Sequence, residues 1–498
     1  MVVDSLIEGI TIALSWPVIG WLVVGLLAGI VLGALPGIGS PVGMAIVLPL
    51  TIPLDSTSAI ILLTAIYSGA MFGGSIAAIL INAPGTESAA ATTLDGYQMT
   101  KNGLAKNALA TAATASALTG FLAVIVVIAL SPVLIEVVAM VQSPEYFLLA
   151  VLGIALITII AKGSIVKGVV AGAFGFMIST IGVAIMTPNP RYTFGVLELY
   201  DGIDFVAALI GMFAFAEMMK LAARRTITDE AIEVAGSVRE GIKAVFQNSK
   251  TTLKSGVIGL GIGMVPGSGA TTSTFVAYAE EARSSTKDAE FGSGDIRGVI
   301  APEAANNPTV SGSIVPTIAF GIPGSGSTAV LLGGLLMHGI DPGPGLFDAA
   351  DELAFTYALF ISIFVGNFII LAAGLTVIPY ASKLTEIDTN IIIPAVVVLS
   401  VAGAFTLNRN WFDVFAVVTL GIIGFYMVKY NYSIIAFVLG IVLGPIAEEN
   451  FFRSLEISGG SYSIFVTRPL SLVLTILIVL ILLGPFVKPY LKRKIDRA

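Results

Sequence analysis

The chain has 498 residues, of which 56% are hydrophobic and only 11% are charged, and its formal net charge is -7. Soluble domains are roughly a quarter charged, so a soluble globular fold is excluded. The acidic balance provides no basic surface for nucleic acid. The sequence contains no cysteine, which excludes disulfides, thiolate nucleophiles and thiolate metal sites.

Charged residues are absent from stretches that are long enough to cross a bilayer. None occurs between Glu8 and Asp55, between Lys106 and Glu136, or between Glu303 and Asp341. A transmembrane helix needs about 20 apolar residues, and continuous apolar runs favour helices over the alternating strands of a membrane barrel. The sequence therefore predicts an all-α integral membrane protein with about ten to twelve transmembrane helices.

In chain order, the hydrophobic segments lie near residues 17–35, 57–81, 104–130, 145–161, 164–186, 203–223, 254–265, 298–320, 326–340, 354–378, 389–408, 412–428, 431–446 and 469–487. We divide the chain into a first membrane repeat at 1–223, a connection at 224–253, a second membrane repeat at 254–487 and a basic tail at 488–498.

The connection lies in the most highly charged part of the chain. Of the 57 charged side chains, 21 lie between Glu217 and Glu303. The stretch TDEAIEVAGSVREGIKAVFQ has apolar residues at helical spacing, which suits either an amphipathic helix on the membrane surface or a solvated linker helix. Lysine and arginine cluster in the connection and in the tail, so both are predicted to be cytoplasmic. The acidic N-terminus is predicted to be periplasmic.

Two sequence elements recur in the same order. GALPGIGS, from Gly33, returns as GMVPGSGA, from Gly263, with the prolines 230 residues apart. A second element containing NAPGT returns with GIPGS, and its prolines are 239 residues apart. Such duplication is common in transporters.

The loops that flank the two copies carry charges of opposite sign. The segment before the first copy is acidic, whereas the segment before the second is the basic connection. After the second element, Lys101 and Lys106 follow the first half, and acidic residues from Asp341 to Glu352 follow the other. The positive-inside rule places such loops on opposite sides of the membrane, so we expect inverted-topology repeats. The alternative is an old duplication without functional meaning.

Four Pro-Gly turns interrupt the apolar segments in paired positions of the two repeats. Proline breaks the helical hydrogen-bond ladder, and irregular backbone at membrane depth occurs only inside protein or beside a watery cavity. A helix that restarts there directs its unpaired N–H groups and positive dipole end at the break, which suits a carboxylate. Simple bending of the helices is the alternative. The candidate substrate-binding residues around these turns are Pro36, Gly37, Gly39, Ser40, Asn82, Pro84, Gly85, Thr86, Pro266, Gly267, Ser268, Gly269, Pro323, Gly324 and Ser325.

The stretch APEAANNPTVSG, from Ala301, adds further polar candidates. Asn306 and Asn307 offer amide donors and carbonyl acceptors for a carboxylate or a cation, so both are candidate substrate-binding residues. Glu303 is a candidate for ion coupling, as a proton carrier or cation ligand, because ionisable groups in membrane segments are costly and usually functional. The alternative places Glu303 at the membrane interface. Glu87 is the second ion-coupling candidate, unless it pairs with a nearby lysine.

Other features carry weaker functional meaning. Asp95 is typical of a helix end or turn, and His338, the only histidine, is typical of an interfacial position. One histidine does not make a metal site, and no phosphate-binding loop occurs. We therefore expect neither a resident metal nor a cofactor, apart from a coupling Na⁺ or H⁺.

The motifs GALPGIG, NAPGT followed by LDGY, GMVPGSG, APEAANN and GIPGS occur here in the order seen in one transporter family. The sequence resembles the large membrane subunit of tripartite tricarboxylate transporters. That resemblance implies a multi-pass protein of the bacterial inner membrane that imports carboxylates and is driven by a sodium or proton gradient. It also implies two partners, a periplasmic substrate-binding protein and a small membrane subunit with about four helices.

The composition is also compatible with other classes of membrane protein. An ion channel, or an anion transporter that needs no binding protein, would share the apolar composition. An intramembrane enzyme is disfavoured, because the sequence has no cysteine, no metal-ligand cluster and no paired catalytic aspartates in apolar segments. We therefore expect no catalytic residues, and the sequence does not identify the carboxylate.

Overall fold

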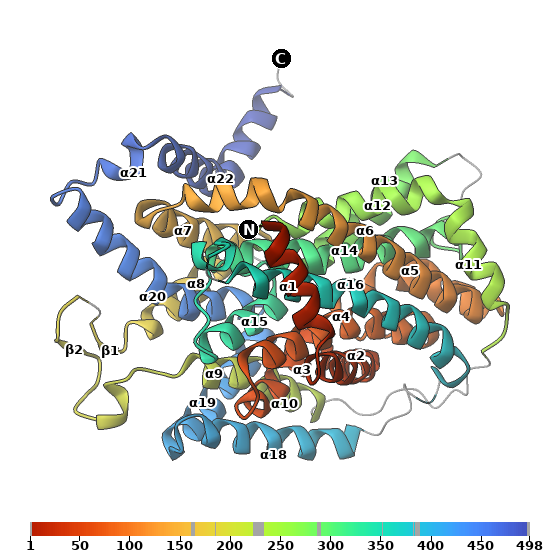
Figure 1. The fold of residues 1–498 in the computed structure, drawn as a ribbon, viewed down its shortest axis with the longest axis horizontal. Helices are drawn as coiled ribbons and strands as arrows, with labels where there is room; N and C mark the ends of the chain where they lie inside the picture. The colour runs from red at the N-terminus through yellow and green to blue at the C-terminus, as the bar shows by residue number, and fades with distance from the viewer. Residues whose placement is uncertain are drawn as a thin grey trace. The chain divides into compact units, whose positions relative to one another are not determined.

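The computed structural model describes residues 2–160, 165–184, 186–222, 234–285, 290–350, 352–381, 383 and 389–495. The described chain is almost entirely helical, with one short hairpin (Figure 1). It forms two compact units, each built from two separate stretches of the sequence. Unit 1 contains residues 1–135 and 206–425, and unit 2 contains residues 136–205 and 426–498.

Unit 1 begins with the elements that surround the first pair of Pro-Gly turns. They are α1 (Val2–Leu14), α2 (Val18–Ala34), α3 (Gly39–Val47), η1 (Leu48–Thr51), α4 (Ser56–Ile81), η2 (Glu87–Ala90), α5 (Thr93–Lys101) and α6 (Ala105–Ala139), whose last turn passes into unit 2.

The second stretch of unit 1 contains the other pair of turns. Its elements are α9 (Phe205–Leu209), the π-helix η4 (Ile210–Phe215), α10 (Ala216–Ala222), α11 (Val238–Gln247), α12 (Ser249–Gly263), α13 (Gly269–Ser284), α14 (Arg297–Phe320), α15 (Gly326–Met337), η5 (Pro344–Phe347), α16 (Leu353–Val377), η6 (Ile378–Tyr380), α18 (Thr389–Asn408) and α19 (Trp411–Lys429).

Unit 2 consists of α7 (Ser143–Ile160), α8 (Ile165–Ser179), β1 (Gly182–Val183), β2 (Pro190–Arg191), η3 (Leu197–Leu199), α20 (Ile434–Ile457), α21 (Ile464–Thr467) and α22 (Pro469–Ile495). The strands β1 and β2 pair antiparallel. Within this unit, Arg468 of the α21–α22 junction donates to buried Glu145 of α7 at 2.8 Å.

Seven described helices are long and apolar enough to cross a membrane, and an eighth span results if α1 and α2, which are bent by 65°, count as one. Five other apolar helices are shorter. The prediction of a helical membrane protein is confirmed. The number of spans stays a prediction, because it depends on how many of the shorter helices cross.

The core of unit 1 is built on α4 and α14. Nearly every residue of both helices is buried, including the polar ones. Asp55 caps the start of α4 by accepting from the Ser58 N–H at 2.9 Å. A helix that is buried on all sides must satisfy its polar groups within the protein. The polar residues of α4 and α14 are therefore candidates for a functional role.

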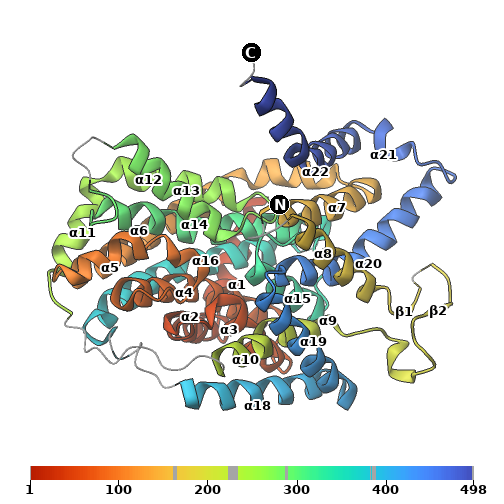
Figure 2. The ribbon, with the colours of Figure 1, turned by 180° about the vertical axis from the view of Figure 1, so that it is seen from behind.

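Small residues allow α2 to approach α4 and α12 to approach α14, as is usual between membrane helices. These two helix pairs form neighbouring groups in unit 1, coloured red to orange and green (Figures 1 and 2). Glycines of α2 and α12 contact the backbone of the facing helix, and these contacts recur at the same spacing as the sequence motifs. The pairs are Gly29 with Ile66, Gly33 with Ala70, Gly259 with Ala305 and Gly263 with Thr309.

The repeat is therefore visible in packing as well as in sequence. The opposite membrane orientation of the two copies and the division at 1–223, 224–253, 254–487 and 488–498 stay predictions. Of the helix expected in the connection, the structure describes α11, which begins at Val238. Residues 223–233 and 496–498 lie outside the described residues.

Candidate functional site

The first Pro-Gly turn of each repeat joins two helices, α2 to α3 and α12 to α13. Gly37 and Gly39 have φ values of +92° and +54°, and the matching Gly267 and Gly269 have +77° and +64°. Only glycine adopts this left-handed conformation at little cost, which explains why both motifs have two glycines with one residue between them. The two turns thus share one backbone shape.

The second Pro-Gly turn of each repeat follows a left-handed residue that ends a buried helix. Asn82 ends α4 with φ +55°, and Gly321 ends α14 with φ +66°. They are 239 residues apart, like the prolines that follow them. The main chain then turns before η2 in one repeat and before α15 in the other.

Within each repeat, the first turn lies against the second. Gly85 packs so closely on the Gly33 carbonyl that no side chain fits between them. In the other repeat, the Gly269 N–H donates to the Gly324 carbonyl at 3.1 Å. Each pair of helix breaks therefore forms one junction.

Reciprocal contacts join the junctions of the two repeats. Ser40 of α3 and Ser327 of α15 share a hydrogen bond of 2.6 Å between their hydroxyls. In the reverse sense, Thr274 of α13 donates to the Ser88 carbonyl of η2 at 2.9 Å. In both contacts, the helix that follows the first turn of one repeat meets the element that follows the second turn of the other repeat. Reciprocal contacts of this kind are those of a two-fold axis. All four predicted turns are therefore gathered in one region of unit 1.

Asn306 and Asn307 lie on α14 close to this region and are almost completely buried. Asn306 donates to the Met71 carbonyl of α4 at 3.0 Å, and Asn307 donates to the Asn367 side chain of α16 at 2.9 Å. The side-chain oxygen of each asparagine has no protein partner. Because unpaired buried oxygens are unfavourable, these two are available to accept from a ligand or bind a cation.

Glu303 lies one turn before the asparagines and is fully buried within the protein. Its Oε1 accepts from Ser75 at 2.6 Å and from Thr92 at 2.5 Å, and its Oε2 accepts from Ser116 at 3.1 Å. No lysine, arginine or histidine among the described residues forms an ion pair with it. A carboxylate held only by hydroxyls suits a group that takes up and releases a proton or a cation.

Several predicted site residues have other roles in this conformation. The Ser268 hydroxyl donates to the Ile262 and Val265 carbonyls, and the Ser325 hydroxyl accepts from the Thr328 N–H at the start of α15. Glu87 is exposed and forms no salt bridge with a residue that the structure describes. Asn82 is also exposed. These hydroxyls therefore shape the turns, whereas Glu87 stands apart from the buried polar cluster.

Comparisons with known proteins place the sequence in a family. The sequence matches the model of the tripartite tricarboxylate transporter TctA family over residues 19–439. A protein of Agrobacterium vitis, named as an uncharacterized 52.8 kDa protein in the TAR-I ttuC' 3'region, is 35% identical over 477 residues, which are 94% of this chain and 93% of that protein. A second A. vitis protein, named for the TAR-II ttuC' 3'region, is 33% identical over 210 residues, which are 42% of this chain and 86% of that one. No solved structure gives a significant match.

The chain belongs to the tripartite tricarboxylate transporter TctA family. The matched residues include all four Pro-Gly turns, Glu303 and the asparagine pair. This TctA-family chain is a multi-pass membrane protein of a transport system, as the sequence motifs predicted.

The hydroxyls around Glu303 were not identified from the sequence of this TctA-family chain. Ser75, Thr92 and Ser116 come from α4, from the start of α5 and from α6. Isolated serines and threonines in apolar segments are common and form no motif. The spacing of 239 residues pairs Glu303 with Thr64 and Asn307 with Ser68 on the buried helix of the other repeat, and it does not lead to these three hydroxyls.

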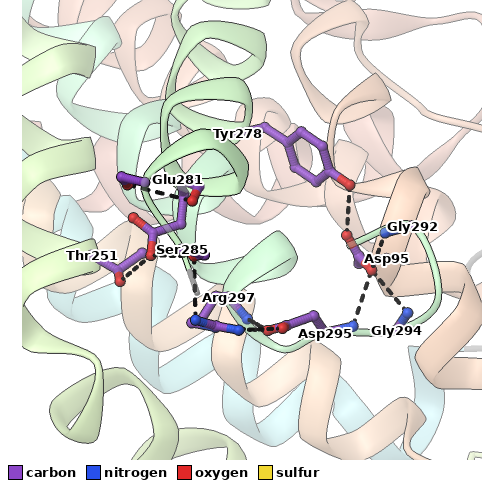
Figure 3. A network of polar contacts seen from close by, with 10 residues as sticks. Asp95, Thr251, Tyr278, Glu281, Ser285, Gly292, Gly294, Asp295 and Arg297 are labelled. Carbon is purple, nitrogen blue, oxygen red and sulfur yellow. Dashed lines mark hydrogen bonds and ion pairs between the residues drawn. The ribbon is translucent and has the colours of Figure 1, made fainter. Parts of the chain in front are cut away.

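Asp95 of the LDGY motif belongs to a separate polar network beside the start of α14 (Figure 3). Its Oδ1 accepts from the backbone N–H groups of Gly292, Gly294 and Asp295 at 2.8 to 3.0 Å, and its Oδ2 accepts from the Tyr278 hydroxyl at 2.8 Å. Asp95 therefore ties α5 of one repeat to the loop that precedes α14 of the other, and it lies in the first turn of α5, at a helix end as expected.

The same network contains an ion pair between Asp295 and Arg297 at 2.6 Å. Burial raises the pKa of Asp295, but the hydrogen bonds and charge of Arg297 outweigh burial and hold that pKa below its ordinary value. Asp295 therefore stays ionised at neutral pH. The loop that leads into α14 is held by its bonds to Asp95 and by the Asp295–Arg297 ion pair.

Proposed function

We propose that this TctA-family protein is the large membrane subunit of a secondary transporter that imports tricarboxylate or dicarboxylate anions across a bacterial inner membrane. The observation that carries this proposal is the meeting of four helix breaks from two repeats in one buried region. The Ser40–Ser327 contact brings the starts of α3 and α15 together there. Breaks of this kind form the substrate sites of repeat-built transporters.

The chemistry of the region suits a carboxylate. The helices α3, α13 and α15 all restart directly after Pro-Gly turns, and the first N–H groups of a helix attract anions. Asn306 and Asn307 lie beside them with amide groups that can orient an anion or bind the ion transported with it. An elevator-like or rocking motion of the repeats would then expose the site to each side in turn.

We propose two partners and an ion gradient as the other parts of the system. A periplasmic binding protein delivers the carboxylate, and a small membrane subunit with about four helices completes the membrane complex. Import of an anion against its gradient needs a coupled cation, and Glu303 is the buried ionisable group best placed to bind or release one. The system therefore uses Na⁺ or H⁺.

The test is reconstitution of the purified chain with both partners in liposomes, followed by uptake of a panel of carboxylates under imposed Na⁺ or H⁺ gradients. We expect saturable uptake that requires one of the gradients and the binding protein. Folded, correctly inserted protein that takes up none of the carboxylates would reject the proposal. Conductance without coupled uptake would instead identify a channel.

A further inference from the structure

A narrow cavity inside unit 1 has three hydroxyls that lack hydrogen-bond partners. The cavity lies between α2, α4 and α16, and it is lined by the hydroxyl-bearing residues Thr64, Ser68 and Ser362 among apolar side chains. Each of the three is at most 4% exposed, and its hydroxyl oxygen has no partner in the protein. Thr64 and Ser68 are one turn apart on α4, so both project from the same face of that helix.

Other hydroxyls inside the described helices bond to the backbone of their own helix. Thr114 and Thr119 of α6 and Thr309 of α14 each donate to the carbonyl one turn earlier, at 2.7 Å. Such a local bond satisfies a hydroxyl at almost no cost. Thr64, Ser68 and Ser362 do not make it, although each lies within a helix, and all three line the cavity.

The size of the cavity restricts what can satisfy them. No point in it has room for a water molecule, so neither a buried water nor a carboxylate fits. A bare Na⁺ ion is smaller than water. The lining contains no charged side chain, which disfavours Mg²⁺ and Ca²⁺, because protein sites for these ions normally include carboxylates.

The other repeat carries polar residues at the equivalent positions. A shift of 239 residues relates Thr64 to Glu303 and Ser68 to Asn307, and the Ser-to-Gly spacing of Ser362 and Gly366 in α16 repeats that of Ser116 and Gly120 in α6. Glu303 of the second repeat accepts a hydrogen bond from Ser116 of the first. The cavity therefore corresponds in position to the Glu303 cluster, but its lining contains no carboxylate.

We propose that Thr64, Ser68 and Ser362 contribute oxygen ligands to a Na⁺ site in this cavity. The proposal rests on the proposed transport function, for which it identifies Na⁺ as a coupling ion. Asn307 provides an unpartnered oxygen on the neighbouring α14, and it bonds to Asn367, the residue after Gly366 of the cavity wall. Because α2 and α4 lead from the cavity to the first and second Pro-Gly turns, a bound ion would hold both helix breaks in position.

The direct test is ²²Na⁺ binding to the purified full-length chain, without a carboxylate, at constant ionic strength with choline as the replacement cation. We expect saturable binding that Li⁺ reduces more than K⁺. Thr64→Val, Ser68→Ala and Ser362→Ala should each raise the half-saturating Na⁺ concentration by about tenfold, since each removes one oxygen ligand. Thr64→Ser should bind like the wild type, because it keeps the hydroxyl.

Ser400→Ala is the matched control, because the Ser400 hydroxyl is also buried and unpartnered but lies on α18, outside the cavity wall. Its Na⁺ affinity should be unchanged, and the melting temperatures of all variants in choline identify any that fail to fold. No saturable binding to the wild type would overturn the proposal. So would wild-type affinity in folded Thr64→Val, Ser68→Ala and Ser362→Ala, or loss of binding only in Glu303→Gln.

The same experiment separates this site from the proposed function. Na⁺ binding without gradient-dependent carboxylate uptake would reject the transport function and keep the site. Uptake driven by a proton gradient, without Na⁺ binding, would keep the function and reject the site.

Discussion

Buried polar side chains inside the membrane domain need hydrogen-bond partners, and those of Asn306 and Asn307 are only partly satisfied. Each donates from its amide nitrogen to a neighbouring helix, but both side-chain oxygens are unpaired. A pair of half-satisfied amides next to helix breaks is what a ligand site needs before the ligand arrives.

Asn306→Ala and Asn307→Ala should each reduce gradient-driven carboxylate uptake by about tenfold or more, because each removes a polar group from the site. Uptake is measured in liposomes at equal amounts of folded protein. Asn450→Ala on α20 is the control and should transport normally. Wild-type uptake in both alanine variants would remove the two asparagines from the site.

Glu303→Gln should separate exchange from net uptake. The substitution keeps the shape of the side chain and one acceptor oxygen for Ser75 and Thr92, but it removes the ionisable group. We expect exchange of carboxylate across the membrane to persist while gradient-driven accumulation is lost. Accumulation equal to that of the wild type would show that Glu303 does not take part in coupling.

At the scale of secondary-structure elements, the ends of the helices determine the geometry of the turns. Proline and glycine stop α2, α4, α12 and α14 at matching places, and the restarts α3, α13 and α15 are only 9, 16 and 12 residues long. Short helices after a break are stabilised mainly by packing, so the fit between the turns is what holds these elements.

Gly85→Ala should disturb that fit. A methyl group at Gly85 would collide with the Gly33 carbonyl, and forced overpacking costs about 1–3 kcal/mol. We expect a lower melting temperature of the purified protein. Gly261→Ala on α12 is the matched control, because nothing lies near its added Cβ. Equal melting temperatures for the two variants would contradict the close approach of Gly85 to Gly33.

Asp95→Asn tests the link between α5 and the loop before α14. One carboxylate oxygen accepts three backbone N–H bonds, and the amide would replace charged acceptors with weaker ones at a cost of about 1–3 kcal/mol. Hydrogen exchange should become faster at residues 290–296. The exposed Asp341→Asn variant should leave that loop unchanged, and unaltered exchange in Asp95→Asn would show that the loop does not depend on Asp95.

The two repeats determine the organisation of the whole membrane domain. Their turns share backbone conformations, and their contacts with each other are reciprocal. Compact unit 1 contains all four turns, while unit 2 takes one stretch from each half of the chain.

The absence of native cysteine makes the orientation of the repeats directly testable. Lys101→Cys and Asp341→Cys place single thiols at exposed, nearly equivalent positions after the two repeats. Inverted repeats should make the two thiols react with an impermeant maleimide from opposite sides of sealed vesicles. Labelling of both from the same side would show that the repeats are parallel.

Local properties of the sequence were sufficient for much of this description. Hydropathy alone identified a helical membrane protein, because crossing a bilayer imposes long apolar segments. The Pro-Gly turns and their duplication were visible because proline and glycine act on their own backbone, and these motifs pointed to the transporter family. Glu303 and the asparagine pair were recognised because polar groups in apolar segments are exceptional.

Tertiary structure decided which groups meet. Nothing local in the sequence brings Ser75, Thr92 and Ser116 to one carboxylate, because they lie on different helices. The sequence also does not distinguish Thr64, Ser68 and Ser362 from the many hydroxyls that bond to their own helix. Whether a hydroxyl is satisfied locally or faces a cavity depends on how helices far apart in the chain pack together, and only the folded protein determines that packing.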